Sequence, residues 1–271
     1  MVKQVSSTSN PLVKWARALH RRRIRIKEGK ALIEGVRLVE EALKAGIGLE
    51  MVFYRPGIED RPGGRRLLEE VGHRAARLVA VTDRVMEALA GTETPPGMVA
   101  VIEPTRYHLE DLQMDEWPLV VAVEGVQDPG NLGSIIRSAD AAGASGVILS
   151  PGTVDPYNPK VLRSTMGSIF HLPVVSVPDL VPALNWLRGK GARVVVSDPE
   201  GEKTIYQVDF RRPTVVVVGQ EAAGCSEAVR QVADEIARIP MKGQAESLNV
   251  GVAAGVILFE ALRQRVARGG T

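Results

Sequence analysis

The chain has 271 residues, of which 45% are apolar and 24% are charged, and this is typical of a soluble globular protein with about two domains. No apolar run reaches the ~18 to 20 residues of a membrane-spanning helix, and residues 1–10 lack the apolar stretch of a secretory signal, so we expect a cytoplasmic protein. A single cysteine, Cys225, excludes an internal disulfide, and four scattered histidines do not indicate a metal site. We interpret Cys225 as a small buried residue; a reactive thiol is the alternative.

The net charge of +2 conceals an asymmetry along the chain. Residues 1–106 hold 19 Lys and Arg against 13 Asp and Glu, whereas the remainder holds 15 against 19. The first 30 residues carry nine basic side chains and one acidic one, and the densest run consists of Arg21, Arg22, Arg23 and Arg25. Such a cluster is typical of a surface that binds phosphate groups, because each neutralised phosphate releases counterions. A solvated basic helix face would also explain it.

The first hundred residues predict a small α/β domain. Residues 11–23 have apolar positions at helical spacing after Ser9 or Asn10 as N-cap, which predicts one amphipathic basic helix. Further helices are predicted at 36–45, 65–71 and 83–89, and strands at 31–34, 49–54, 76–81 and 98–102. We assign residues 1–104 to this domain.

A polar stretch without a clear period predicts a linker at residues 105–117, and a second domain follows at 118–271. In this domain strand-length apolar runs lie at 119–123, 147–149, 174–177, 194–196, 215–218 and 236–239. Helical spacing marks the segments 131–142, 159–167, 179–188, 224–232 and 249–265. Near-continuous Val and Ile runs predict strands that are covered on both faces, and therefore a mostly parallel sheet between helices.

Ligands of such sheets bind beyond the carboxyl ends of the strands, which draws attention to three loops. In the first loop, Asp128 or Asn131 is a suitable cap for the following helix, whose amides would attract an anion. Gly133 and Arg137 are four residues apart and share one helix face, so a ligand can approach the backbone beside a guanidinium. A capped helix with a surface arginine would explain this segment equally well.

The second loop, residues 218–224, has two glycines and the carboxylate of Glu221 at the end of an apolar strand. Glu221 is a candidate hydrogen-bond acceptor, although a simple strand-to-helix turn also accounts for the pattern. No loop contains the GxGxxG or GxxxxGK[ST] sequences of common nucleotide sites, which disfavours a metabolic enzyme that uses a nucleotide.

The third loop, residues 239–250, is longer than a simple connection requires and carries Ser247 and Asn249 just before a helix. Helix capping alone would explain either residue. Gly251 and Gly255 follow inside the helix, where each costs about 1 kcal/mol relative to alanine. Close helix packing, within the domain or across a dimer interface, would compensate for this cost.

The three loops, in this order, resemble the motifs of the SpoU (TrmH-type) RNA methyltransferases of the SPOUT superfamily. Residues 131–139 (NLGSIIRSA) resemble the first motif, residues 219–224 (GQEAAG) the second, and residues 239–241 with 247–249 (IPM and SLN) the third. Residues 10–14 and 34–42 resemble the substrate-binding domain of many members, which has a fold like that of ribosomal protein L30e. The resemblance covers nearly the whole chain.

The resemblance implies methylation of a ribose 2′-hydroxyl in structured RNA with S-adenosylmethionine as cofactor. It also implies a parallel sheet with a deep trefoil knot, and a homodimer in which Arg137 of one subunit meets the cofactor contacts of the other. The implied cofactor contacts are Gly219, Ile239, Met241 and Leu248. The implied catalytic set is Arg137, Asn131, Glu221, Ser247 and Asn249. The residues expected to contact RNA are Arg21, Arg22, Arg23, Arg25 and Arg37.

The sequence leaves alternatives for the substrate and for the role of Arg137. Ala222 and Ala223 stand where members often have glycine. Ribosomal RNA is favoured by analogy, with transfer RNA or a non-catalytic RNA-binding or ribosome-assembly role as alternatives. Arginine is sometimes assigned as the base in this family, but because arginine stays protonated we favour charge stabilisation by Arg137.

Overall fold

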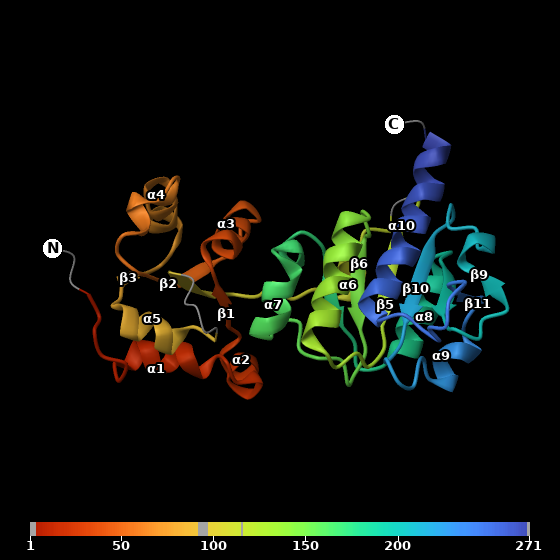
Figure 1. Cartoon of the computed structure of the whole chain (residues 1–271), viewed down its shortest axis with the longest axis horizontal. Helices are drawn as coiled ribbons and strands as arrows, with labels where there is room; N and C mark the ends of the chain where they lie inside the picture. The colour runs from red at the N-terminus through yellow and green to blue at the C-terminus, as the bar shows by residue number, and fades with distance from the viewer. Residues whose placement is uncertain (1–3, 92–96, 115, 270–271) are drawn as a thin grey trace. The chain divides into compact units, whose positions relative to one another are not determined.

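The computed structural model describes residues 4–91, 97–114 and 116–269, and these divide into two compact units. The first unit holds Met1–Thr105 and Tyr157–Phe170, and the second holds Arg106–Pro156 and His171–Thr271. A short segment from the middle of the chain therefore packs with the N-terminal residues (Figure 1).

The first unit contains a four-stranded mixed sheet with helices on both faces. Its strands are β1 (Ala31–Glu34), β2 (Leu49–Tyr54), β3 (Leu78–Ala80) and β4 (Met98–Ile102). Its helices are α1 (Pro11–Ala18), α2 (Arg22–Glu28), α3 (Val36–Lys44), the 3-10 helix η1 (Ile58–Asp60), α4 (Gly64–Arg74) and α5 (Asp83–Leu89). The strand order is β1-β4-β2-β3, with β4 antiparallel to both neighbours and β2 parallel to β3. Helices α1 and α5 lie on one face and α3 and α4 on the other, as the predicted α/β domain requires (Figure 1).

The chain breaks between α1 and α2, so the prediction of one continuous helix over residues 11–23 is wrong. Leu19 is fully buried in the core, and Arg21 has an extended backbone (φ −88°, ψ 123°). The guanidinium of Arg25 donates 2.8 Å hydrogen bonds to the carbonyl oxygens of Leu19 and His20. These bonds satisfy carbonyls at the end of α1 that the break leaves without helical donors. Arg25 is accordingly only 5% exposed, and we leave it out of the RNA-binding surface.

Within the first unit, the segment Tyr157–Phe170 packs against the N-terminal residues through a buried carboxylate. It contains α7 (Pro159–Thr165) and the 3-10 helix η3 (Ser168–Phe170), and α7 contacts β1. Arg163 Nη1 lies 3.4 Å from Oε1 of Glu34, whose side chain is 2% exposed. The same oxygen accepts a 3.1 Å hydrogen bond from the backbone amide of Gly91. A buried carboxylate is stable only when it is paired in this way, so Glu34 fixes the position of α7.

The second unit is a parallel sheet, as predicted. Its strands are β5 (Leu119–Val123), β6 (Gly146–Leu149), β7 (Val174–Ser176), β8 (Arg193–Ser197), β9 (Lys203–Thr204), β10 (Thr214–Val218) and β11 (Glu235–Arg238). Its helices are η2 (Leu109–Asp111), α6 (Pro129–Ala141), α8 (Leu180–Gly189), η4 (Ile205–Gln207), α9 (Glu227–Gln231) and α10 (Val250–Gly269). The strand order is β7-β6-β5-β10-β8-β11-β9, and every neighbouring pair is parallel.

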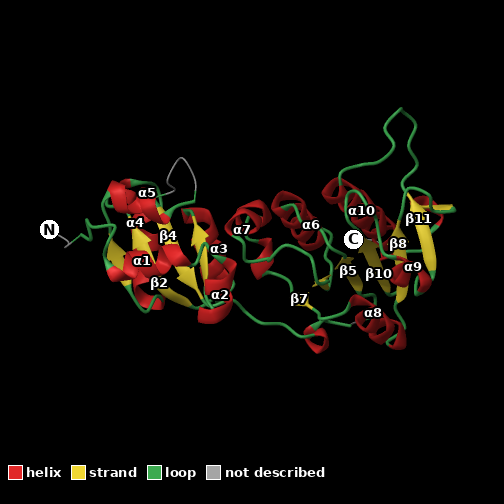
Figure 2. Ribbon diagram, turned by 90° about the horizontal axis from the view of Figure 1, so that it is seen from below, coloured by secondary structure: helices red, strands yellow, loops and turns green. Residues whose placement is uncertain are grey.

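Helices cover both faces of this sheet, with α6 and α10 on one face and α8 and α9 on the other (Figure 2). Gly251 and Gly255 of α10 face Ser134 and Ser138 of α6, where an added Cβ would lie 3.1 and 3.4 Å from the serine side chains. The glycines are therefore used for close packing within the domain. Leu112, from the stretch that reads as a linker, is buried in the core under α8.

Among the residues that the structure describes, no helix is both long and apolar enough to span a membrane.

The sole thiol offers a test of core packing in the second unit. Cys225 is buried, and burial together with the carboxylates of Glu124 and Asp198 raises the pKa of its thiol from 9.0 to about 12. Because the thiolate is the nucleophile, we expect iodoacetamide at pH 8.5 to alkylate the urea-unfolded protein rapidly and the native protein hardly at all. Mass spectrometry would follow the reaction. Equal rates in the two states would contradict the packing described here.

Candidate active site

The carboxyl ends of β5, β10 and β11 place the three loops at one edge of the sheet. β5 and β10 are direct neighbours, and β11 is separated from β10 only by β8. The amide of Glu124, the first residue after β5, donates a 2.9 Å hydrogen bond to the carbonyl of Val218, the last residue of β10. The first two loops therefore begin side by side.

The first loop is shaped by a cap and by a glycine. The Asp128 side chain accepts a 2.9 Å hydrogen bond from the amide of Asn131, so Asp128, rather than Asn131, caps α6. Gly125 has a φ of +68°, and its amide donates to Ser150 Oγ at 3.0 Å and to Thr153 Oγ1 at 3.1 Å. Ser150 and Thr153, which follow β6, support the loop. Neither residue is among the site residues predicted from the sequence, although both follow an apolar strand, which was an available signal.

The second loop closes on itself through its backbone. Gln220 and Gly224 exchange two hydrogen bonds of 2.9 and 3.1 Å between their amides and carbonyls. A Cβ at Gly219 would collide with the backbone of Gly224 and Cys225. Glycine at position 219 is thus a steric requirement of this turn, and Ala222 and Ala223 at its exposed tip are compatible with it.

A network of side-chain hydrogen bonds joins the three loops. Asn131 Nδ2 donates to Glu221 Oε1, and Asn131 Oδ1 accepts a 2.8 Å hydrogen bond from Asn249 Nδ2. The Asn249 Oδ1 atom accepts from the amides of Gly251 (3.0 Å) and Val252 (3.3 Å), which caps α10. Because its carboxamide has distinct donor and acceptor ends, Asn131 can satisfy both partners in one orientation only. Three of the five predicted catalytic residues are thereby brought together.

The other two, Arg137 and Ser247, lie at the surface. Arg137 is exposed on α6, and its guanidinium has no hydrogen-bond or ion-pair partner within the described part of the chain. Six residues separate it from Asn131, or about 9 Å along the helix axis. Ser247 is exposed in the third loop. The structure therefore leaves both side chains available for a ligand.

The predicted cofactor residues lie at the ends of the second and third loops. Gly219 is buried directly after β10, Ile239 is half-buried directly after β11, and Leu248 is half-buried two residues before α10. Met241, within the third loop, is exposed. Glu124, Gly125, Ser150, Asp179 and Gln220 line a separate cavity of about 350 Å³ at the same edge. This cavity adjoins the second loop, but the four predicted cofactor residues do not line it.

The predicted RNA-binding arginines of the first unit are exposed, with one exception. Arg21, Arg22 and Arg23 are exposed at the start of α2, and Arg37 is exposed in the first turn of α3. Arg25 is buried, as described above.

Comparisons with known proteins identify the family to which this chain belongs. The family described as "SpoU rRNA Methylase family" matches residues 118–259, which is just over half of the chain. The chain belongs to this family. A second match, to the "MRM3-like substrate binding domain", covers residues 10–100.

Two relatives and a solved structure match this SpoU family protein over nearly its whole length. The 23S rRNA (uridine(2479)-2′-O)-methyltransferase of Streptomyces viridochromogenes is 36% identical over 97% of this chain and 93% of its own. The 23S rRNA (guanosine(2553)-2′-O)-methyltransferase of Bacillus subtilis is 35% identical over 95% and 98%. The crystal structure of an AdoMet-bound rRNA methyltransferase from Sinorhizobium meliloti has a TM-score of 0.87 at 35% identity and covers 96% of this chain and 97% of that one. AdoMet is S-adenosylmethionine.

The network can be tested by removing its cap on α10. The Asn249→Ala variant loses the bonds to the Gly251 and Val252 amides, and we expect it to be less stable by about 1 kcal/mol in urea unfolding. Ser247→Ala, two residues earlier in the same loop, is the matched control and should unfold like the wild type. Equal stability of the two variants would show that the Asn249 bonds do not stabilise the helix start.

Proposed function

We propose that this protein transfers a methyl group from S-adenosylmethionine to a ribose 2′-hydroxyl of ribosomal RNA, with 23S rRNA favoured. The observation that carries the proposal is the hydrogen-bond network of Glu221, Asn131 and Asn249, which joins the three motif loops at the ligand-binding edge of a parallel sheet. The two curated relatives are both 23S rRNA 2′-O-methyltransferases, which supports the choice of substrate. A cytoplasmic location, expected from the sequence, suits that substrate.

The residues present fit S-adenosylmethionine. Ile239 and Leu248 offer half-buried apolar side chains at the two ends of the third loop, which suits an adenine ring. Gly219 lies directly after β10, at the same end of the sheet. We assign the binding of adenosine to these three residues, with Met241 nearby. The sulfonium of the cofactor supplies an electrophilic methyl group.

The chemical role of this chain is to orient the hydroxyl and to stabilise charge. The 2′-oxygen must be held in line with the methyl group, and negative charge develops on it as its proton passes to solvent. The new O–CH3 bond then forms as the S–CH3 bond of the cofactor breaks. A protonated guanidinium with five donors can stabilise this charge. Arg137 is the arginine of the first motif, and its side chain is exposed. We assign Asn131, Glu221, Ser247 and Asn249 to the positioning of Arg137, the RNA phosphate and the cofactor.

A homodimer completes this proposal. Val252, Phe259 and Val266 recur every seven residues along α10 and are 53%, 50% and 56% exposed, which makes an apolar stripe on the outer side of the helix. A second copy packed there would cover the stripe. It would also bring the exposed Arg137 of the adjacent α6 to the partner's cofactor residues, which agrees with the ~9 Å between Arg137 and Asn131 along the helix.

The trefoil knot also belongs to the proposal. The third loop carries the chain from β11 across the positions of β8 and β10 to α10, which packs on α6. Passage of this segment through an earlier loop would give the knot of the family and would fix the ends of the third loop beside Gly219.

The decisive experiment is transfer of labelled methyl from S-adenosylmethionine to separate fractions of unmodified ribosomal RNA and transfer RNA. Nuclease digestion would locate the label, since the two relatives modify different bases, a uridine and a guanosine. Label on a ribose 2′-oxygen of ribosomal RNA would support the proposal. Label on transfer RNA alone would show that the substrate is transfer RNA and not ribosomal RNA. Absence of label from both fractions, with the cofactor bound, would support the non-catalytic alternative.

Arg137→Ala should lower kcat by on the order of 100-fold or more, because one preorganised donor is lost. Binding of S-adenosylmethionine, measured by calorimetry, should be unchanged. Arg137→Lys keeps the charge but loses the planar fork, and we expect it to recover only a small part of the rate. Near-normal turnover of the alanine variant would remove Arg137 from the mechanism.

The basic run at the start of α2 is tested by salt dependence. Replacement of Arg21, Arg22 and Arg23 by alanine should weaken RNA binding and flatten the slope of log K against log salt by about 0.7 to 0.9 per lost phosphate contact. Filter binding at several salt concentrations measures this slope. An unchanged slope would assign the run to a solvated helix face.

The dimer is tested by charge on the apolar stripe. Phe259→Glu should convert a dimer to a monomer in analytical ultracentrifugation, because burial of an unpaired carboxylate at an interface is costly. Gln231→Glu makes a comparable charge change on α9, on the opposite face of the sheet, and should leave the mass unchanged. A wild-type protein that is already monomeric would refute this part of the proposal.

A further inference from the structure

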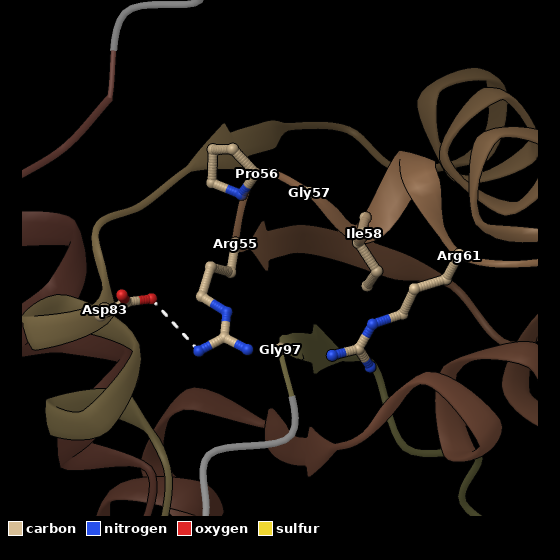
Figure 3. A pocket seen from close by; sticks show the side chains of 7 residues that line it. All are labelled: Arg55, Pro56, Gly57, Ile58, Arg61, Asp83 and Gly97. Carbon is tan, nitrogen blue, oxygen red and sulfur yellow. Dashed lines mark hydrogen bonds and ion pairs between the residues drawn. The ribbon is translucent and has the colours of Figure 1, made fainter.

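The first unit contains a cavity of about 340 Å³ with two arginines at its sides. Loop residues 55–58, Arg61, Asp83 and Gly97 line it. Figure 3 shows the guanidinium groups of Arg55 and Arg61 extending toward each other from opposite sides of the cavity. A volume of this size accommodates a small polar ligand or one unit of a larger one.

Backbone hydrogen bonds fix the places from which the two arginines extend. Arg55 directly follows β2, and its amide donates a 2.9 Å bond to the carbonyl of Gly97. Arg61 directly follows η1, and its amide donates a 3.2 Å bond to the carbonyl of Ile58. Ile58 is buried, and Gly57 has a φ of +92°, which favours glycine at that position. The cavity is therefore a product of ordered backbone.

The charges at the cavity favour an anion. Arg55 Nη1 lies 3.2 Å from Asp83 Oδ1, whose side chain is 70% exposed. The guanidinium of Arg61 has no hydrogen-bond or ion-pair partner among the described residues. Glu59, in the same loop, turns its carboxylate to the amide of Gly57 at 3.0 Å. The cavity lining therefore carries two positive guanidinium groups and one negative carboxylate, and that carboxylate is mostly exposed to solvent.

The cavity lies at the same end of the sheet as the start of α3, the helix that carries Arg37, one of the arginines predicted to contact RNA. The amide of Gly35, just before α3, donates a 2.9 Å bond to the carbonyl of Met98, and Arg55 bonds to the carbonyl of the preceding residue, Gly97. The residue before α3 and the first residue of the cavity lining therefore bond to two adjacent residues at the start of β4. Arg37, in the first turn of α3, and Arg55, directly after β2, therefore belong to segments that meet at the start of β4.

We propose that Arg55 and Arg61 together bind one phosphate group of the RNA substrate, with Asp83 holding Arg55 in place in the free protein. Guanidinium groups pair with phosphate oxygens through short, charge-assisted and often bidentate hydrogen bonds. The incoming phosphate competes with Asp83 for Arg55 and supplies Arg61 with an ion-pair partner. This inference rests on the proposed function, because it requires an RNA substrate.

The test uses the full-length protein and unmodified 23S rRNA transcribed in vitro, with filter binding over a series of salt concentrations. Arg61→Ala should weaken binding and flatten the salt slope by about 0.7 to 0.9, the value for one phosphate contact. Arg65→Ala removes the same charge from an exposed position four residues away, outside the cavity lining, and should leave the slope unchanged. Arg61→Lys should keep most of the slope and lose affinity, because lysine lacks the planar fork.

A second variant predicts a change in the opposite direction. Asp83→Asn removes the competitor for Arg55, so we expect tighter RNA binding than that of the wild type. A side chain with a merely structural role at this rim would not give a gain.

In methyl-transfer assays the Arg61→Ala change should raise KM for RNA and leave kcat at saturating RNA unchanged.

The outcomes separate this inference from the proposed function. If the wild type binds and methylates RNA but Arg61→Ala behaves like Arg65→Ala, the cavity does not bind phosphate and the proposed function stands. If Asp83→Asn weakens binding, the competition between Asp83 and phosphate is refuted. If the wild type neither binds nor methylates RNA, the proposed function fails, and the inference fails with it.

Discussion

The carboxamide of Asn131 is the group that holds the three loops of the candidate active site together. Its two ends bond to Glu221 in the second loop and to Asn249 in the third, and its own amide is held by the cap residue Asp128. The parallel sheet makes this contact possible, because it places the carboxyl ends of β5, β10 and β11 at one edge. Loops separated by about a hundred residues in the chain then meet within hydrogen-bond distance.

Glycines allow the backbone to approach closely where the site requires it. Gly219 lies against the backbone of Gly224 and Cys225, and Gly251 lies against Ser134 on α6. The first contact shapes the second loop, and the second brings the start of α10, with Asn249, close to Asn131. A cost of about 1 kcal/mol for glycine in a helix is therefore offset by packing that also positions a side chain of the site.

The arginines of the first unit are of two kinds, exposed ones and ones that bind groups within the protein. The first unit keeps Arg21, Arg22, Arg23 and Arg37 at its surface and uses Arg25 and Arg163 internally, on helix carbonyls and on the buried Glu34. Basic composition alone therefore overstates the surface available to RNA. An arginine is free to bind a phosphate only where no nearby carbonyl or carboxylate already takes up its donors.

The sequence by itself determined the order and type of most elements, the parallel sheet and the three loops of the site, because apolar periodicity and helix caps act over a few residues. It identified Asn131, Glu221 and Asn249 through resemblance to a family. Only the tertiary structure decided the break after α1, the burial of Arg25, the docking of α7 on Glu34 and the facing of Arg55 and Arg61 across a cavity. The docking of α7 and the cavity bring together residues distant in the chain, which local patterns do not encode. The break after α1 accompanies the burial of Leu19 in the core, and Arg25 then bonds to the carbonyls that the break leaves free.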